Sequence, residues 1–194
     1  MAANWQSTES FVVPQAIDET STVKKNPIGM IVHARDISTQ PASGTGTQGN
    51  ATGEGQFIYL VATAANAVGM AVIYELPDST DLNGKTTLIT NSNAKGSVAI
   101  AMASFGVGEF GWYQIYGNAV INNAVDGGTA HAGAADVPLY ACATAGCLSS
   151  TAINSVGILT SYVLLAKGQI STYTCLARIQ YPSVFTQVTL KQLA

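Results

Sequence analysis

The sequence predicts an all-β protein, built as an antiparallel β-sandwich or barrel with an extended N-terminal arm. Short apolar runs recur along most of the chain, and turn residues such as Asn83-Gly84 and Lys95-Gly96 lie between them. No apolar pattern is long enough for a helix that would cover a parallel sheet. About eight short strands with regular turn signals are typical of sandwiches and barrels. The pattern does not distinguish between the two.

Nine runs in the sequence have strand character. They are residues 28–34, 56–62, 69–75, 85–90, 97–103, 111–117, 137–143, 155–161 and 171–181. The run at 97–103 shows the two-residue period of a pleated strand. Its even-numbered residues, Val98, Ile100 and Met102, would share one face, and three alanines would form the other. Asn83-Gly84 is a dipeptide typical of a tight hairpin turn before the run at 85–90.

We expect one β domain over residues 27–194, preceded by an arm over residues 1–26. The arm is polar except for an apolar island at Phe11-Val12-Val13, which would dock elsewhere. Residues 39–55 form a loop rich in Gly, Thr, Ser and Gln, which we expect to be mobile or held by a partner. Residues 119–135 could hold one helical turn followed by a Gly/Ala loop.

Charge is scarce in this chain. Hydrophobic residues make up 47% and charged residues only 10%, whereas an average soluble domain has about 25% charged residues. No Lys or Arg occurs between Lys95 and Lys167. We therefore expect much of this stretch to be buried in the fold or against other subunits. The net charge of −3 argues against nucleic acid as a partner, because phosphate binding needs clustered Lys and Arg.

The sequence also favours a soluble protein made in the cytoplasm. The N-terminal residues lack the basic and apolar regions of a secretory signal. The apolar segment at 156–166 is shorter than the roughly 20 residues of a membrane helix, so we expect no membrane partner. The cysteines, Cys142, Cys147 and Cys175, are odd in number and lack a C-x-x-C pair, which favours buried or half-buried thiols over a disulfide framework or a zinc site.

Three glycines, Gly106, Gly108 and Gly111, fit the G-x-G-x-x-G spacing of dinucleotide-binding loops. That function needs a helix after the loop, whose N-terminal amides bind the pyrophosphate. The residues that follow, Trp112–Tyr116, are aromatic and β-branched and predict a strand. We therefore interpret the glycines as a turn between antiparallel strands and expect no cofactor.

The sequence favours neither a catalytic site built on its histidines nor a ligand-stacking site built on its aromatic residues. His33, close to Asp36, could act as a base, but a histidine at the sheet surface is the simpler interpretation, and His131 is isolated in a Gly/Ala stretch. We therefore expect a protein that is not an enzyme. The aromatic residues could form a stacking platform for a sugar or base, although core or interface positions are favoured. They are Tyr59, Tyr74, Trp112, Tyr113, Tyr116 and Tyr140.

The order of several segments resembles a family of phage proteins. The segments are "GEGQFIYL" at 53–60, "VGMAVIYE" at 68–75, "KGSVAIAMA" at 95–103, "FGWYQIYGNA" at 110–119 and "VPLYACATAGCLSS" at 137–150, followed by "AINSVGILTS" and a β-rich end. Together they resemble capsid decoration (cement) proteins of tailed bacteriophages, especially those of marine and cyanobacterial phages. The resemblance covers roughly residues 27–179.

The resemblance implies a structural role on the exterior of the virion. Such a protein would form a homotrimer at junctions between major capsid protein subunits and lock them together, without catalysis or cofactor. The resemblance supplies no contact residues. Our own candidates for contacts with the capsid or a second copy are the apolar residues of the arm and the central aromatic run, namely Trp5, Phe11, Val12, Val13, Trp112, Tyr113 and Tyr116.

Two alternatives within the virion remain open. The chain could be a host-recognition module that binds a receptor or glycan through exposed Trp112 and Tyr113, or a minor head or tail component. An enzyme that uses His33 and Asp36 is a third class with little support.

Overall fold

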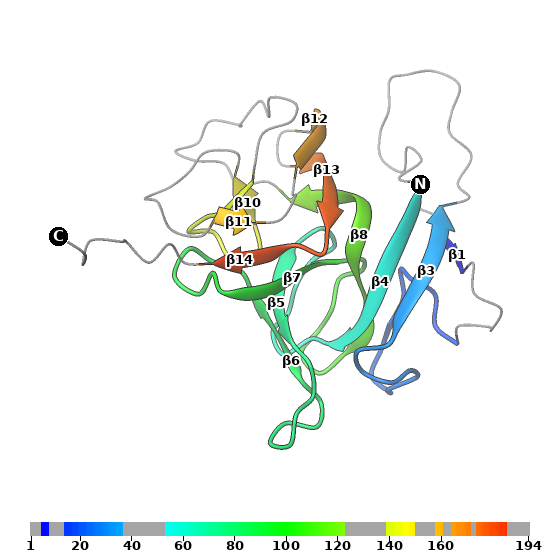
Figure 1. The fold of residues 1–194 in the computed structure, drawn as a ribbon. Coiled ribbons are helices and arrows are strands. Elements are labelled where there is room, and N and C mark those ends of the chain that lie inside the picture. Colours follow the sequence, from blue (N-terminus) through cyan, green and yellow to red (C-terminus); the bar gives the residue numbers. More distant parts are fainter. Residues whose placement is uncertain are drawn as a thin grey trace.

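The computed structural model describes residues 5–7, 14–36, 53–122, 139–149, 158–160, 164–171 and 174–185. Within these residues the chain forms β-strands and no helix (Figure 1), and all the strand pairs are antiparallel. The predicted all-β antiparallel class is therefore confirmed. The strands are β1 (Trp5–Ser7), β2 (Thr20–Ser21), β3 (Ile31–Asp36), β4 (Glu54–Val61), β5 (Ala71–Glu75), β6 (Lys85–Leu88), β7 (Gly96–Ala101), β8 (Phe110–Asn122), β9 (Tyr140–Ala141), β10 (Leu148–Ser149), β11 (Ile158–Thr160), β12 (Leu164–Ser171), β13 (Thr174–Gln180) and β14 (Ser183–Phe185).

Strand β8 pairs with four other strands, more than any other strand of the sheet described here. One of its edges pairs with β4, whose other edge pairs with β3 and then β1. The opposite edge of β8 pairs in turn with β2, β7 and β13. Strand β7 also pairs with β5 and with β14, which leads to β11, β9 and β10. The sheet therefore branches where β8 changes partner.

One end of the sheet closes on itself through side chains. Strand β6 pairs with β5, and its Thr86 hydroxyl donates to the carbonyl oxygen of Val61 on β4 at 3.0 Å. The Thr63 hydroxyl in turn donates to the carbonyl oxygen of Thr86. These bonds complete a barrel-like ring of β4, β8, β7, β5 and β6.

The buried apolar side chains form three cores. The barrel core contains Ile58, Leu60, Ala62, Val72, Ala99, Ala101, Ala103, Phe105, Tyr113 and Ile115. The sandwich core, between β5–β7 and the strands β9, β10, β13 and the end of β8, contains Ala71, Ile73, Ile89, Ala94, Val98, Ile100, Ala119, Ile121, Leu139, Ala141, Leu148, Ala177 and Ile179. The N-terminal core contains Ile17, Val32, Ala34, Phe57, Tyr59 and Trp112. The protein thus combines barrel-like closure with sandwich packing.

The two-residue period predicted for β7 is confirmed, because its alternate residues lie in different cores. Val98 and Ile100 lie in the sandwich core, whereas Ala99 and Ala101 lie in the barrel core. Met102, predicted on the face of Val98, packs instead against the N-terminal core, after the strand has ended. Because β5 and β7 are buried on both faces, they consist of nearly continuous apolar residues.

Two local predictions need correction. The residues at 119–122, expected to begin a helical turn, form the end of β8, because β13 pairs with them. The Asn83-Gly84 dipeptide does not form a tight hairpin: β5 and β6 pair from Glu75 and Lys85, so residues 76–84 make a long connection that projects from the fold (Figure 1).

Part of the predicted arm packs on the domain. Gln15 and Ile17 are buried, and the backbone of β2 pairs with the first residues of β8. Residues 14–26 therefore belong to the packed structure, while the island at Phe11–Val13 lies outside the described residues. Most of the Gly/Thr-rich loop at 39–55 also lies outside them, and its last residues begin β4.

The glycine-rich segment is a structural turn, as predicted. Gly108 has a φ of +84°, which glycine adopts readily, and the Glu109 amide donates to the Gly106 carbonyl oxygen at 3.2 Å. The Glu109 carboxylate accepts the Gly106 amide at 2.7 Å. Strand β8 follows directly. The third glycine, Gly111, allows close packing, because a Cβ there would lie 2.4 Å from the Phe105 ring.

The glycines should therefore differ in their tolerance of a side chain. We expect Gly111→Ala to lower the free energy of unfolding by about 2 kcal/mol, because the methyl group would displace the buried Phe105 ring. Gly106→Ala is the matched control, since its nearest neighbour is the Glu109 carboxylate at 3.5 Å, and it should change stability by less than about 0.5 kcal/mol. Urea denaturation of both variants tests this, and equal losses would contradict it.

Candidate contact surface

Two of the predicted contact residues are buried in the structure. Trp112 and Tyr113 are each 0% exposed. The pleat of β8 points Trp112 into the N-terminal core and Tyr113 into the barrel core, so both faces of the strand are covered at this point. The prediction that they contact a capsid, a second copy or a glycan is therefore wrong, and both are core residues.

Trp112 holds residues of the predicted arm in place. Its indole N–H donates to the carbonyl oxygen of Gln15 at 3.0 Å, and its ring meets Tyr59 edge-on with the ring centroids 5.0 Å apart. The Tyr59 hydroxyl donates to the Gln15 side-chain oxygen at 2.7 Å. The Gln15 side-chain nitrogen completes the network by donating to the carbonyl oxygens of Glu19 and Phe110. The burial of Gln15 could not be predicted from the sequence, because a polar residue in a polar stretch gives no signal of burial.

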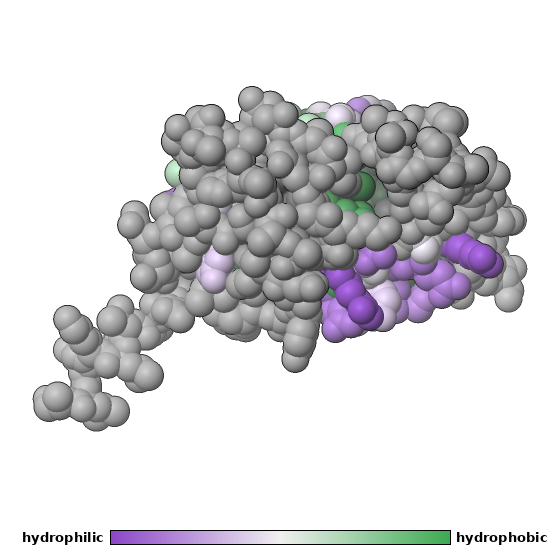
Figure 2. Space-filling model, turned by 90° about the horizontal axis from the view of Figure 1, so that it is seen from above, coloured by the Kyte–Doolittle hydropathy of each residue, from purple (hydrophilic) through white to green (hydrophobic). Residues whose placement is uncertain are grey.

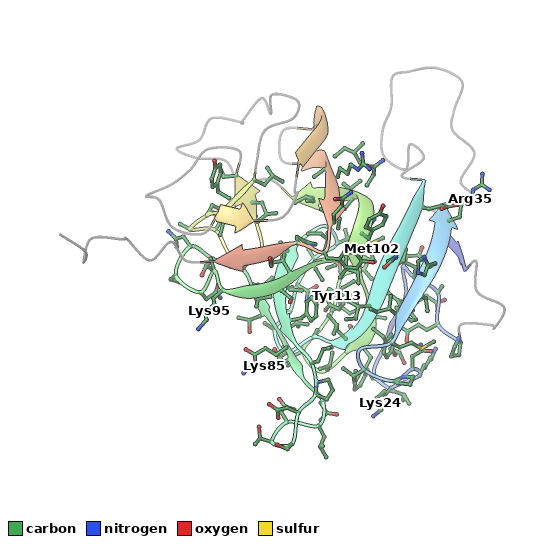
Figure 3. The ribbon with its side chains drawn as sticks, viewed as in Figure 1. Lys24, Arg35, Lys85, Lys95, Met102 and Tyr113 are labelled. Carbon is green, nitrogen blue, oxygen red and sulfur yellow. The ribbon has the colours of Figure 1, made fainter. Side chains whose placement is uncertain are left out.

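Tyr113 lies at the centre of the barrel core (Figure 3). Its ring stacks on Phe105, with the centroids 4.8 Å apart and the planes inclined by 11°. Its hydroxyl accepts a hydrogen bond from the Asn66 side-chain nitrogen at 3.3 Å. Burial raises the pKa of Tyr113 from 10.0 to about 12, because the phenolate would lose its hydration.

The remaining central aromatic, Tyr116, is half-buried and stays a candidate. It lies where β8 pairs with both β4 and β13, directly between Gln56 and Gln180. Its ring centroid is 5.7 Å from that of Tyr181, with the planes inclined by 40°. Tyr181 is 53% exposed. These four residues, Gln56, Tyr116, Gln180 and Tyr181, form an uncharged row across three strands, here called the tyrosine row.

Tyr181 is held in a strained backbone conformation. Its φ is +46°, a region that residues other than Gly, Asn and Asp rarely occupy. Its amide donates to the carbonyl oxygen of Ile115 at 2.7 Å, and its hydroxyl donates to the Gln56 side-chain oxygen. A strained residue that is kept in place by its neighbours and exposes an aromatic ring suggests a functional position. In the sequence, Tyr181 directly before Pro182 at the end of a strand-like run is the signal that could have found it.

Several other large apolar side chains are exposed among the described residues. They are Val23, Ile31, Val68, Leu76, Leu82 and Val107. Most lie in turns and connections rather than in strands. In the view of Figure 2, hydrophilic described residues gather along one edge, and apolar colour shows in a recess near the middle of this face.

The labelled basic residues lie apart from one another. Figure 3 shows them around the outline of the ribbon, at Lys24, Arg35, Lys85 and Lys95. The ammonium of Lys85 lies 2.9 Å from the carboxylate of Glu75, across the β5–β6 pair. These four labelled residues do not form one basic patch.

Of the other residues singled out in the sequence, some lie on described strands and some lie outside the described residues. Trp5 lies on β1, which pairs with the end of β3. Phe11, Val12, Val13 and His131 lie outside the described residues. His33 is an exposed residue of β3, as expected for a histidine at the sheet surface.

Cys142 is buried and Cys147 half-buried, and neither is in a disulfide. No group of three His, Cys, Asp or Glu side chains in the described part of the chain is arranged to hold a metal ion. Within that part there is also no helix long and apolar enough to cross a membrane. No family model, curated protein or solved structure matches the chain.

The raised pKa of Tyr113 predicts alkaline destabilisation. Its folded pKa of about 12 lies above the ordinary value of 10.0, so the contribution to stability is complete below pH 10 and is lost as the pH rises to 12. By about pH 12 the loss should reach roughly 2 kcal/mol. Urea denaturation from about pH 9 to pH 12 should show a smaller loss in Tyr113→Phe than in the native chain. Equal losses would contradict the assignment, since other tyrosines titrate in both proteins.

Proposed function

We propose that this protein is a structural component of a tailed-phage virion, a capsid decoration protein that binds at junctions between major capsid protein subunits. It would act as a homotrimer on the capsid exterior. The sequence resemblance supplies the candidate role. The observation that carries the proposal is the tyrosine row, four uncharged and partly exposed residues at the point where three strands meet.

The chemistry of the tyrosine row suits a protein contact. Tyrosine offers a large rigid surface with a polar tip, so it loses little conformational entropy on binding. The side-chain amide of Gln180 can donate to and accept from a backbone. That of Gln56 can donate to one, since its oxygen already accepts the Tyr181 hydroxyl. Interface cores are depleted of charged residues, and this chain has only 10% of them.

The structure does not favour host recognition through a glycan. Its motivating residues, Trp112 and Tyr113, are buried. The rings of Tyr116 and Tyr181 are inclined by 40°, so they do not present one flat face on which a sugar would stack. The structure favours a protein contact at this surface.

Tyr181→Asn tests the proposal without disturbing the backbone, because asparagine tolerates the left-handed conformation that Tyr181 adopts. We expect the native protein to elute as a trimer and to co-sediment with capsids assembled without it. The variant should remain folded by circular dichroism and bind these capsids at least tenfold more weakly, which corresponds to about 1.4 kcal/mol.

Leu82→Asn is the matched control, since it removes another exposed side chain, on the 76–84 connection. It should bind capsids like the native chain. A native protein that is monomeric and does not bind capsids would overturn the proposed function. Equal binding by native and Tyr181→Asn proteins would overturn the role of the tyrosine row.

A further inference from the structure

Two thiols lie across a short hairpin that the proposed function does not use. Strands β9 and β10 pair with Leu148 opposite Ala141 and Ser149 opposite Tyr140. Extended by one residue beyond the ladder, this register would place Cys147 opposite Cys142. The Cys142 thiol donates to the carbonyl oxygen of Cys147 at 3.4 Å and to that of Thr144 at 3.5 Å. The two residues are therefore already in contact.

Opposed positions of this kind suit a disulfide bond. Residues opposite each other in an antiparallel pair have Cα atoms about 4.5–5.5 Å apart. Disulfides join residues whose Cα atoms are about 4.4–6.8 Å apart. Rotation of the two side chains about their Cα–Cβ bonds could therefore bring the sulfur atoms together without a change in the strand pairing.

The surrounding backbone holds the hairpin in this geometry. The Gly146 amide donates to the Ile89 carbonyl oxygen at 2.8 Å, and the Gly146 carbonyl oxygen accepts the Ala71 amide at 2.8 Å. The Asn91 amide donates to the Cys142 carbonyl oxygen at 2.8 Å. The turn is thus tied to the residues after β6 and to the first residue of β5. This support keeps the two thiols together in the folded chain.

We propose that Cys142 and Cys147 form a redox modification site, which closes to a disulfide within the hairpin by exchange with a small-molecule disulfide such as oxidised glutathione. The hairpin would carry two thiols in a reducing compartment and one disulfide in an oxidising one. The inference rests on the hairpin alone and does not require the proposed function.

The exchange has two balanced steps. Cys147, the more exposed of the two, loses its proton, and its thiolate attacks one sulfur of oxidised glutathione. A mixed disulfide forms and one glutathione thiolate leaves. The Cys142 thiolate then attacks the Cys147 sulfur and expels the second glutathione thiolate. The two cysteines lose two protons and two electrons, and two molecules of reduced glutathione carry them away.

The burial of Cys147 sets the pH dependence of the first step. Burial raises the pKa of the Cys147 thiol above its ordinary value of 9.0, because the thiolate is desolvated. Less of the reactive thiolate is therefore present at neutral pH than in an exposed cysteine. The rate of closure should rise about tenfold per pH unit between pH 7 and pH 8.5.

The distribution of basic residues makes the product easy to identify. Trypsin cuts after Lys95, Lys167 and Arg178, so Cys142 and Cys147 fall in the peptide 96–167 and Cys175 in the peptide 168–178. The full chain is incubated natively with oxidised glutathione, and the remaining thiols are alkylated in denaturant before digestion and mass spectrometry.

We expect peptide 96–167 to lose two hydrogen atoms and to carry no alkyl group. Reduction by dithiothreitol should restore two alkylation sites. Closing a short loop restricts the unfolded chain, so the oxidised protein should also melt a few degrees higher. Cys175→Ser should behave identically, which identifies the pair as Cys142 and Cys147.

Cys147→Ser provides the matched control. It should retain one alkylation site in peptide 96–167 and show no change in melting temperature on oxidation. Two alkylated cysteines in the native peptide after incubation at about pH 8.5 would overturn the proposal. Stable glutathione adducts without closure would overturn it as well, because they would show that Cys142 does not reach the mixed disulfide.

Discussion

The two-sided burial of strand β8 is the constraint on which the rest of this structure depends. The strand pairs along one edge with β4 and along the other with β2, β7 and β13 in turn. Its side chains enter all three cores: Trp112 the N-terminal core, Tyr113 and Ile115 the barrel core, and Ala119 and Ile121 the sandwich core. Because one strand supplies every core, a change within it affects the packing of the whole domain.

This arrangement decides which aromatic residues are available to a partner. The barrel and N-terminal cores use Tyr113 and Trp112, whose polar groups find partners inside the fold. Tyr116 stays half-buried, at the position where β8 changes its neighbour from β7 to β13. Tyr181 joins it from the turn after β13. The four residues of the tyrosine row carry no charge, which suits a contact with protein better than one with nucleic acid.

The tyrosine row and the cysteine hairpin belong to different parts of the molecule. The row lies on β4, β8 and the end of β13, and the hairpin covers the sandwich core beside β5 and β6. Oxidation of the hairpin would leave the residues of the row unchanged. The proposed contact surface and the proposed redox site therefore use different residues of one domain.

Local sequence patterns predict the all-β class, most strand positions, the face assignment along β7 and the turn before β8. These are local properties, set by the two-residue period and by turn residues such as Gly108. Contacts between distant strands cover both faces of β8, so Trp112 and Tyr113 are core residues and not contact residues. The tertiary structure also decides that Gln15 is buried and that Cys142 contacts Cys147. Burial and strand register depend on distant partners, and an apolar or aromatic residue has the same identity whether it packs in a core or against another protein.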